Sequence, residues 1–183
     1  MTHTLVLADA CDSPALRLWL APRARVLDEI ARSHSELGCV QLGLDDGTVI
    51  DLLADHVGEV AYAKLTGPRA AAWAQSIAGR FRCLSIPNLL PMLHDGADPR
   101  QWIRALTRLA VLRSESSDQA LLGAWSRALA HPHRAVRRAA IRTCHGSRWP
   151  ELRAVVGARI GVDHGLRGPL EQLAAHLDRI SRS

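Results

Sequence analysis

Hydrophobic positions in the second half of the chain recur at helical spacing and are separated by short polar turns. A proline stands in the first turn of the second of these segments, where a helix tolerates it. The pattern predicts helices over residues 85–94, 99–112, 117–130, 134–145, 150–160 and 166–180. A hairpin of two such helices has an apolar stripe that only a neighbouring hairpin can bury, so the second half is predicted to consist of stacked antiparallel helical hairpins.

The two central helices of this region repeat with an offset of 34 residues. Three arginines of the first helix then align with three of the second, namely Arg100, Arg104 and Arg108 with Arg134, Arg138 and Arg142. A period in the thirties built from two helices is typical of solenoids. The segment Leu129–Ala140 (LAHPHRAVRRAA) resembles the inter-helix turn and second-helix start of a HEAT repeat, and Asp98–Leu106 is a looser copy. The resemblance covers about residues 85–180, and it implies helical hairpins and a binding surface but no activity.

The first half is less regular. Residues 14–20, 24–37 and 68–81 are predicted to be helical. Residues 40–65 allow two interpretations. A turn at Leu44–Thr48 between alternating apolar residues predicts a β-hairpin, whereas Val49, Leu52, Leu53, Val57 and Val60 keep an i, i+3, i+4 spacing that predicts a helix. We favour the helix.

These elements predict an all-α fold, a short right-handed α-solenoid of stacked antiparallel helical hairpins that is HEAT-like. A small β-hairpin near residues 40–65 is the alternative. The expected organisation is an N-terminal helical region over residues 1–84, which becomes α+β if the hairpin forms, and HEAT-like helical repeats over residues 85–183.

Composition agrees with a helical protein, because Ala and Leu dominate while Phe and Tyr occur once each. The four cysteines stand far apart, at positions 11, 39, 83 and 144, which matches neither a zinc site nor a disulfide framework. The N-terminus lacks the pattern of a secretory signal, and no stretch approaches the 18 or so apolar residues of a membrane span. The expected location is cytoplasmic, without a membrane partner.

Charge is distributed unevenly. Residues 1–97 hold 8 Lys or Arg against 11 Asp or Glu, a net charge of −3, whereas residues 98–183 hold 15 Arg against 7 acidic residues, a net charge of +8. Residues i, i+4 and i+8 drift by only about 40° per step around a helix, so each set of three arginines forms a ridge, and Arg137 flanks the second. Adjacent helices would join both ridges into one positive surface that suits phosphates or acidic protein segments. A solvated helix face in an arginine-rich chain is the structural alternative.

Other candidate chemistry is sparse. Trp149 stands in a turn and is the tryptophan expected to be exposed, where it could stack on a base. Two histidines in the turn, His131 and His133, should lie about 15 Å or more from the pair Cys144 and His145 by helical rise, which is too far for one ion. No nucleotide-binding, hydrolase or metalloprotease motif is present. The expected sets of catalytic residues, metal ligands and cofactors are therefore empty.

The leading functional hypothesis is a non-enzymatic binding or adaptor module. It would use a HEAT-like helical surface with the arginine ridge to hold an acidic macromolecular partner, with a protein placed first. The alternative is a DNA- or RNA-binding protein. HEAT-like solenoids are similar to the alkylpurine DNA glycosylases, which makes a glycosylase-like enzyme conceivable. An enzyme whose site is assembled from dispersed residues is a third hypothesis.

Overall fold

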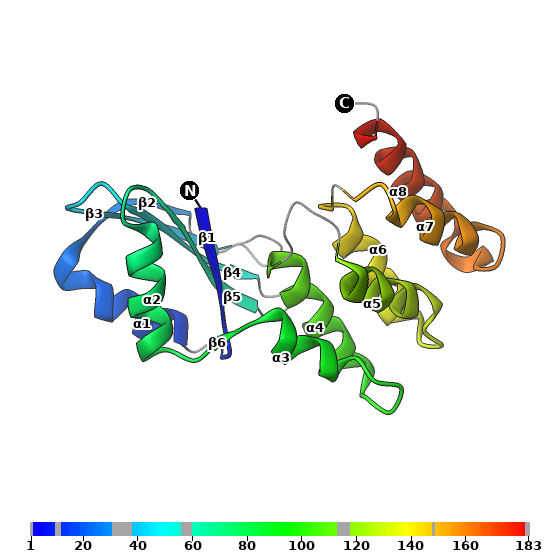
Figure 1. The fold of residues 1–183 in the computed structure, drawn as a ribbon, viewed down its shortest axis with the longest axis horizontal. Helices are drawn as coiled ribbons and strands as arrows, with labels where there is room; N and C mark the ends of the chain where they lie inside the picture. Colours follow the sequence, from blue (N-terminus) through cyan, green and yellow to red (C-terminus); the bar gives the residue numbers. More distant parts are fainter. Residues whose placement is uncertain are drawn as a thin grey trace. The chain divides into compact units, whose positions relative to one another are not determined.

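The computed structural model describes residues 2–9, 12–30, 38–55, 60–112, 118–147 and 149–181. The chain divides into two compact units, Met1–Ser85 and Ile86–Ser183 (Figure 1). The first unit has 8 Lys or Arg and 10 Asp or Glu, a net charge of −2. The second has 15 Arg and 8 acidic residues, a net charge of +7. The basic character of the protein therefore belongs to the second unit.

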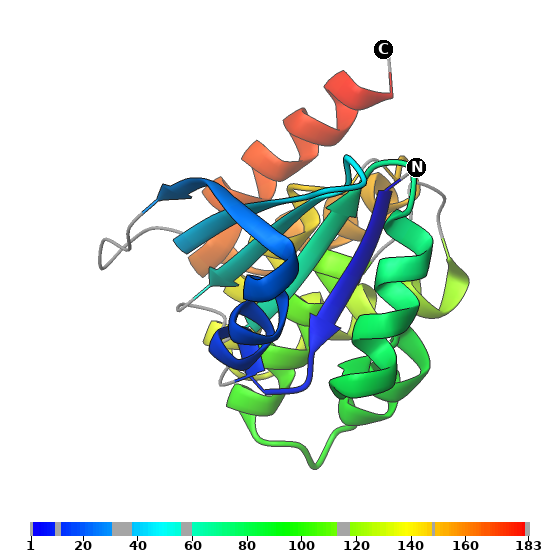
Figure 2. The same ribbon diagram turned by 90° about the vertical axis from the view of Figure 1, so that its left-hand side faces the viewer.

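The first unit combines a six-stranded antiparallel sheet with two helices. In chain order its elements are β1 (Thr2–Leu7), α1 (Asp12–Leu20), the 3-10 turn η1 (Ala21–Arg23), β2 (Ala24–Ile30), β3 (Gly38–Leu44), β4 (Val49–Asp55), β5 (Val60–Thr66), α2 (Ala70–Arg80) and β6 (Cys83–Leu84). The strands lie side by side in the order β2-β3-β4-β5-β1-β6, and every neighbouring pair is antiparallel. Figure 2 shows β2 to β5 beside β1.

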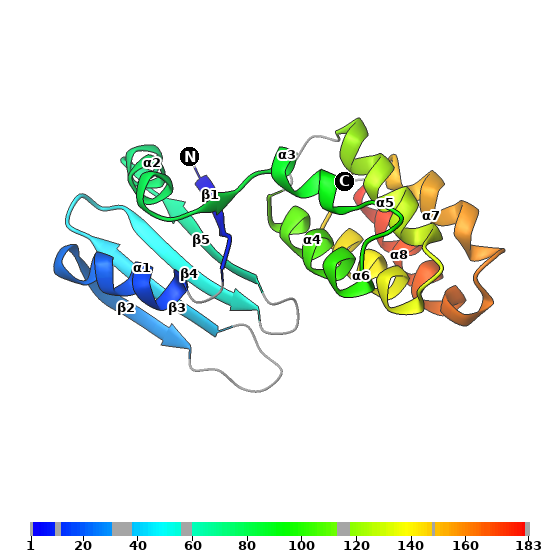
Figure 3. The same ribbon diagram turned by 90° about the horizontal axis from the view of Figure 1, so that it is seen from below.

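Both helices of this unit pack on the same face of the sheet (Figure 3), which we call the helix-covered face. Leu16 and Leu20 of α1 and Ile77 of α2 are fully buried there, against strand residues such as Ile50 and Leu65. The successive residues of a strand point to opposite faces, so the other set of alternating positions defines the open face of the sheet.

The connection between β3 and β4 is a tight turn. The Leu44 amide donates to the Thr48 carbonyl over 2.8 Å, and the Gly47 amide donates to the Leu44 carbonyl over 3.0 Å. Gly47 has a φ of 80°, which an L side chain rarely adopts. Gly67, at the end of β5, packs against this turn so closely that a Cβ would lie 2.8 Å from the Thr48 Cα. Gly67 is therefore required by a close backbone approach.

The expectation of an all-α solenoid, HEAT-like throughout, is wrong, because the first unit is built on a six-stranded sheet. The described residues between 40 and 65 belong to β3, the turn after it, β4 and β5 rather than to a helix, and residues 56–59 of this prediction lie outside the described residues. The apolar spacing that favoured a helix comes from two strands in succession. In β4 the helix-covered Ile50 and Leu52 are buried while Leu53 on the open face is half-buried, and strands that are apolar on both faces lose the alternation that would identify them.

The helix predicted over residues 24–37 is also wrong where the chain is described, because residues 24–30 form β2. Its register with β3 shifts between Val26 and Asp28. A bulge of this kind inserts one residue and breaks the period of two. The apolar residues Val26, Leu27 and Ile30 consequently follow a spacing that suits a helix as well as a strand. Residues 31–37 of this prediction lie outside the described residues.

The second unit is helical, and the helices predicted for it are confirmed within a few residues. Its elements are α3 (Ile86–Leu89), η2 (Leu90–Met92), α4 (Pro99–Leu112), α5 (Gln119–Ala130), α6 (Arg134–Cys144), α7 (Leu152–Ile160), η3 (His164–Leu166) and α8 (Arg167–Ile180). Helix α6 packs on both α4 and α5, and α7 packs on α8. Large buried side chains such as Trp102, Leu106, Trp125 and Leu173 fill the space between the helices. None of the described helices is long and apolar enough to cross a membrane.

Candidate functional site

The candidate site is the outward surface of α4 and α6. These two helices pack against each other and carry the aligned arginines of the sequence repeat. Arg100 and Arg104 of α4 are exposed, as are Arg138 and Arg142 of α6. We call these four residues the arginine surface. The Arg100 guanidinium and those of Arg138 and Arg142 form no hydrogen bond or ion pair with any residue that the structure describes.

The local sequence explains why these side chains point outward. On α4 the buried positions include Trp102, Leu106 and Leu109, all at or below 1% exposure. They lie across the helix from the arginines, because residues two and six positions after Arg100 are rotated by about 200° and 240°. Helix α6 repeats the arrangement with small or β-branched residues in its buried stripe. The arginine surface is thus the polar side of two amphipathic helices.

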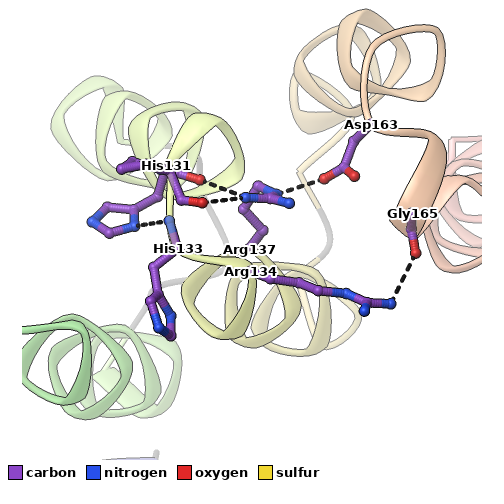
Figure 4. A network of polar contacts seen from close by, with 7 residues as sticks. His131, His133, Arg134, Arg137, Asp163 and Gly165 are labelled. Atoms are coloured by element: carbon purple, nitrogen blue, oxygen red, sulfur yellow. Dashed lines mark hydrogen bonds and ion pairs between the residues drawn. The ribbon is translucent and has the colours of Figure 1, made fainter.

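Arg137 has a different role from its neighbours, because its guanidinium is used inside the unit (Figure 4). Its Nε donates to the Asp163 carboxylate over 2.6 Å, and its Nη1 donates to the carbonyls of His131 and Pro132 over 2.9 and 2.8 Å. The side chains of Arg137 and Asp163 are only 18% and 9% exposed. This contact ties the turn between α5 and α6 to the turn that follows α7.

Arg134 makes a related contact, since its Nη2 donates to the Gly165 carbonyl over 3.2 Å (Figure 4). Arg108, at the end of the first predicted ridge, is half-buried. Of the seven arginines predicted as binding residues, Arg134 and Arg137 therefore contact the segment between α7 and α8. The exposed surface is narrower than the predicted ridge, and it consists mainly of the four residues named above.

The expectation that Trp149 is exposed is wrong. Its side chain is 1% exposed and packs edge-to-face on Trp125, with ring centroids 5.6 Å apart at 88°. The Trp125 indole donates to the Thr143 hydroxyl over 2.9 Å. Trp102 is buried as well, and its indole donates to the His94 carbonyl. Each tryptophan of the second unit is thus a core residue, and none can stack on a nucleic acid base.

Two pairs of histidines of the second unit lie in separate places. His131 accepts a hydrogen bond at Nδ1 from the His133 amide over 3.0 Å, and burial lowers its pKa, with the nearby charge of Arg137 adding to the effect. His145 lies beside His176, with ring centroids 5.4 Å apart, and its pKa is lowered by burial and by His176. No three His, Cys, Asp or Glu side chains in the described ranges are grouped to hold a metal ion.

The first unit has a groove of about 390 Å³ that sequence analysis did not identify. It lies between α1 and the β2-β3-β4 edge of the sheet and is lined by Ser13, Pro14, Arg17, Glu29, Ile30, Gly38, Cys39, Val40, Leu52 and Ala54. Its two charged residues bind each other, because both Nη atoms of Arg17 donate to the Glu29 carboxylate over 2.8 Å.

The chemistry of this groove does not suit catalysis. Its hydrogen bonds with Arg17 lower the pKa of Glu29, which keeps this carboxylate ionised and unable to act as a general acid near neutral pH. Cys39 alternates along β3 with Val40 of the helix-covered face, so its side chain belongs to the open face; burial there raises the pKa of its thiol above the ordinary value of 9.0, and the charges of Asp51 and Asp28 raise it further. A thiol with a raised pKa is a poor nucleophile.

Two aspartates of the first unit have structural partners. The Trp73 indole and the Thr48 amide both donate to Asp46, which lowers the pKa of that carboxyl. Asp51 accepts from the Gln41 amide over 2.8 Å. No protein-family model, curated protein or solved structure matches the chain.

Proposed function

We propose that this protein is a non-enzymatic binding module whose second unit holds an acidic segment of a partner protein on the arginine surface. The observation that supports this proposal is that two packed helices, α4 and α6, present exposed arginines at equivalent positions. A guanidinium binds a carboxylate through two parallel hydrogen bonds, which gives geometric specificity as well as attraction. The cytoplasmic location predicted from the sequence is part of the same proposal.

Four acidic residues in the described part of the second unit are used elsewhere than on this surface. Asp163 binds Arg137, Asp178 binds the Arg153 guanidinium over 2.8 Å, and Glu171 binds Arg167 on the next turn of α8. Asp118 accepts from the Ala120 and Leu121 amides at the start of α5. The guanidinium groups of Arg100, Arg138 and Arg142 form no ion pair with these residues, so their charge is available to an external anion.

A protein partner fits the surface better than a nucleic acid does. Single strands are usually held by aromatic side chains on which the bases stack, and the tryptophans of this unit are buried. Four arginines would neutralise about four phosphates of a duplex, fewer than the roughly six to ten contacts that make binding fall by about 10³–10⁵-fold between 50 and 200 mM salt. The logarithm of the association constant falls with the logarithm of the salt concentration by about 0.9 per phosphate contact, so four contacts give a slope of about −3.6. The affinity for a duplex would then fall by about 150-fold between 50 and 200 mM salt.

Binding of nucleic acid remains the second candidate, because the second unit carries a net charge of +7. A glycosylase-like activity has no such support. The carboxylate nearest to the arginine surface in sequence is Asp98, which accepts from the Arg100 backbone amide over 2.8 Å and so acts at the start of α4.

The test is fluorescence anisotropy with a labelled Glu-rich peptide of about twelve residues and a labelled duplex of about 20 base pairs, each titrated across a salt series. The key variant is Arg138→Gln with Arg142→Gln. Its matched control is Arg127→Gln with Arg179→Gln, which removes the same charge from exposed positions on α5 and α8.

We expect the peptide to bind and the key variant to weaken it by at least about tenfold, while the control changes it by less than about threefold. Equal losses in both variants would show that only net charge matters and would contradict the proposal. A duplex that binds at least about tenfold more tightly than the peptide would favour the nucleic acid alternative.

A further inference from the structure

The edge strand β2 carries more of the exposed large hydrophobic side chains than any other described element. It pairs only with β3, and every residue from Arg25 to Ile30 is exposed. Of the five large hydrophobic side chains that are exposed in the described part of the chain, three belong to it: Val26 at 51%, Leu27 at 44% and Ile30 at 54%. At the other edge of the sheet, β6 has only two residues. An exposed edge of this length offers unpaired backbone groups to another strand.

The bulge in β2 determines which side chains share a face. Leu27 lies at the register shift between Val26 and Asp28. A Cβ added to Gly43 would lie 2.9 Å from Leu27 Cδ1. Gly43 stands between two buried residues of the helix-covered face, so its missing side chain belongs to the open face. The Leu27 side chain therefore lies on the open face as well.

The remaining residues of β2 follow from their partners on β3. Arg25 is opposite Gly43 and Ile30 is opposite Cys39, both on the open face. Val26 and Glu29 are opposite residues of the helix-covered face, and the contact of Glu29 with Arg17 of α1 agrees with this. The open face of β2 thus presents Arg25, Leu27, Asp28 and Ile30, and the helix-covered face presents Val26 and Glu29.

Few antiparallel registers of β2 with itself keep matching faces together, because a shift by one residue moves each side chain to the other side. One register of the six exposed residues does keep side chains of the same face together, and it has its two-fold axis between Leu27 and Asp28. It pairs Arg25 with Ile30, Val26 with Glu29 and Leu27 with Asp28. The two bulges then lie next to each other at the axis, where neither shifts the pairing of the outer residues.

Charge is balanced in this register. Glu29 is already bound to Arg17 within its own chain, which leaves Arg25 and Asp28 as the other charged residues of the edge. Each Arg25 would lie diagonally across from Asp28 of the other strand on the same face, at a spacing within reach of long side chains. Within the described ranges, the Arg25 guanidinium forms no ion pair of its own.

We propose that β2 is a self-association edge, which pairs antiparallel with β2 of a second copy of this chain and joins the two sheets across a two-fold axis. Two-fold symmetric dimers, in which both subunits use the same surface, are the commonest homo-oligomers of soluble proteins. A second copy of the chain fits this edge better than an arbitrary strand, because β2 itself carries both members of the charge pair, Arg25 and Asp28. This association involves the first unit and does not depend on the arginine surface.

The test is sedimentation velocity of the full chain from about 1 to about 300 µM, with charge exchange at the edge. Arg25→Glu places a second carboxylate near Asp28 of the partner subunit, and Asp28→Arg places two guanidinium groups together, so each single variant replaces attraction by repulsion. The double variant restores opposite charges. Arg80→Glu, at an exposed position on α2, is the control for the change in net charge, and circular dichroism establishes that every variant is folded.

We expect a dimer that each single variant weakens by about tenfold, since two symmetric pairs are affected, and that the double variant restores to within about threefold. A chain that stays monomeric over the whole range overturns the proposal. So does a dimer whose dissociation constant is the same in the single variants as in the original chain. Loss of association in the double variant as well as the single ones would refute the register.

Discussion

Replacing Arg137 by alanine should destabilise the second unit severely, although Arg137 stands in a surface pattern of arginines. The substitution removes three hydrogen bonds from a guanidinium that is 18% exposed, and it leaves the Asp163 carboxylate, 9% exposed, without its partner. Hydrogen bonds to charged groups contribute about 1.5–3 kcal/mol each, and breaking a buried pair by removing one member costs about 3–5 kcal/mol. Since the site is partly hydrated, we expect a loss of about 3 kcal/mol.

This loss is large beside the usual 5–15 kcal/mol of total stability. Arg137→Lys should recover less than half of it, because one ammonium cannot reach three acceptors in the same geometry. Arg138→Ala is the matched control, since the adjacent side chain is exposed, and we expect a change within about 0.5 kcal/mol.

Urea unfolding, monitored by tryptophan fluorescence, would give the free energy of unfolding of each variant. Hydrogen exchange of the α6 amides would show that the loss of stability belongs to the second unit. A free energy of unfolding for Arg137→Ala within about 0.5 kcal/mol of that of the original chain would contradict this expectation. An equal loss in Arg138→Ala would contradict it as well, because burial would then not distinguish the two residues.

Three other outcomes are expected, each measurable by the same unfolding assay. Gly67→Ala should lower the free energy of unfolding by more than about 1 kcal/mol, because φ is 134° and the added Cβ would meet the backbone of the β3–β4 turn. In Gly79→Ala, on α2, the added Cβ meets nothing, and the free energy of unfolding should rise by up to about 1 kcal/mol. Asp118→Ala should lose about 1 kcal/mol, because it removes the cap of α5. The pKa of His145 is lowered from 6.5 by burial and by His176; the unfolded chain thus binds more protons, and stability should fall as the pH drops below about 6.5 and through the folded pKa. His145→Asn should reduce this pH dependence, and an unchanged slope would contradict the assignment.

The helices of the second unit could be predicted because each buries one stripe of side chains at intervals of three and four residues. Proline and histidine at the turns mark where the helices end, and the repeat of 34 residues identifies α4 and α6 as equivalent. These signals are local, so they can be recognised in the sequence without knowledge of the tertiary structure. They locate the elements of this unit, but they gave no indication that the first unit is a sheet.

The sheet was missed for reasons that particular strands show. Strand β2 has a bulge at Leu27, so its apolar residues do not alternate. Strand β4 has apolar residues on both faces, and Leu53 next to Leu52 imitates the spacing of a helix. The turn at Gly47 was visible as a hairpin signal. This turn is a stronger signal than the approximate helical spacing of the apolar residues, and it predicts β3 and β4.

The candidate site could be predicted only in part, because partners far apart in sequence decide what each arginine does. Arg137 and Arg138 are adjacent and chemically identical, yet one is bound by a carboxylate 26 residues later and the other is exposed. Trp149 shows the same limit, since its burial depends on Trp125 of another helix. The periodicity of one helix specifies its outward face but not the segment that later packs against that face.

These two kinds of arginine should respond differently to salt. The attraction of the arginine surface acts between solvated charges, which are screened within about 10 Å at 0.1 M salt. The contact of Arg137 with Asp163 is short and largely buried, so added salt should weaken it much less. Raising the salt concentration should therefore release an acidic ligand from α4 and α6 while the urea midpoint of the second unit changes little. A parallel loss of binding and stability would instead mean that the same arginines serve both purposes, and the distinction drawn from burial would fail.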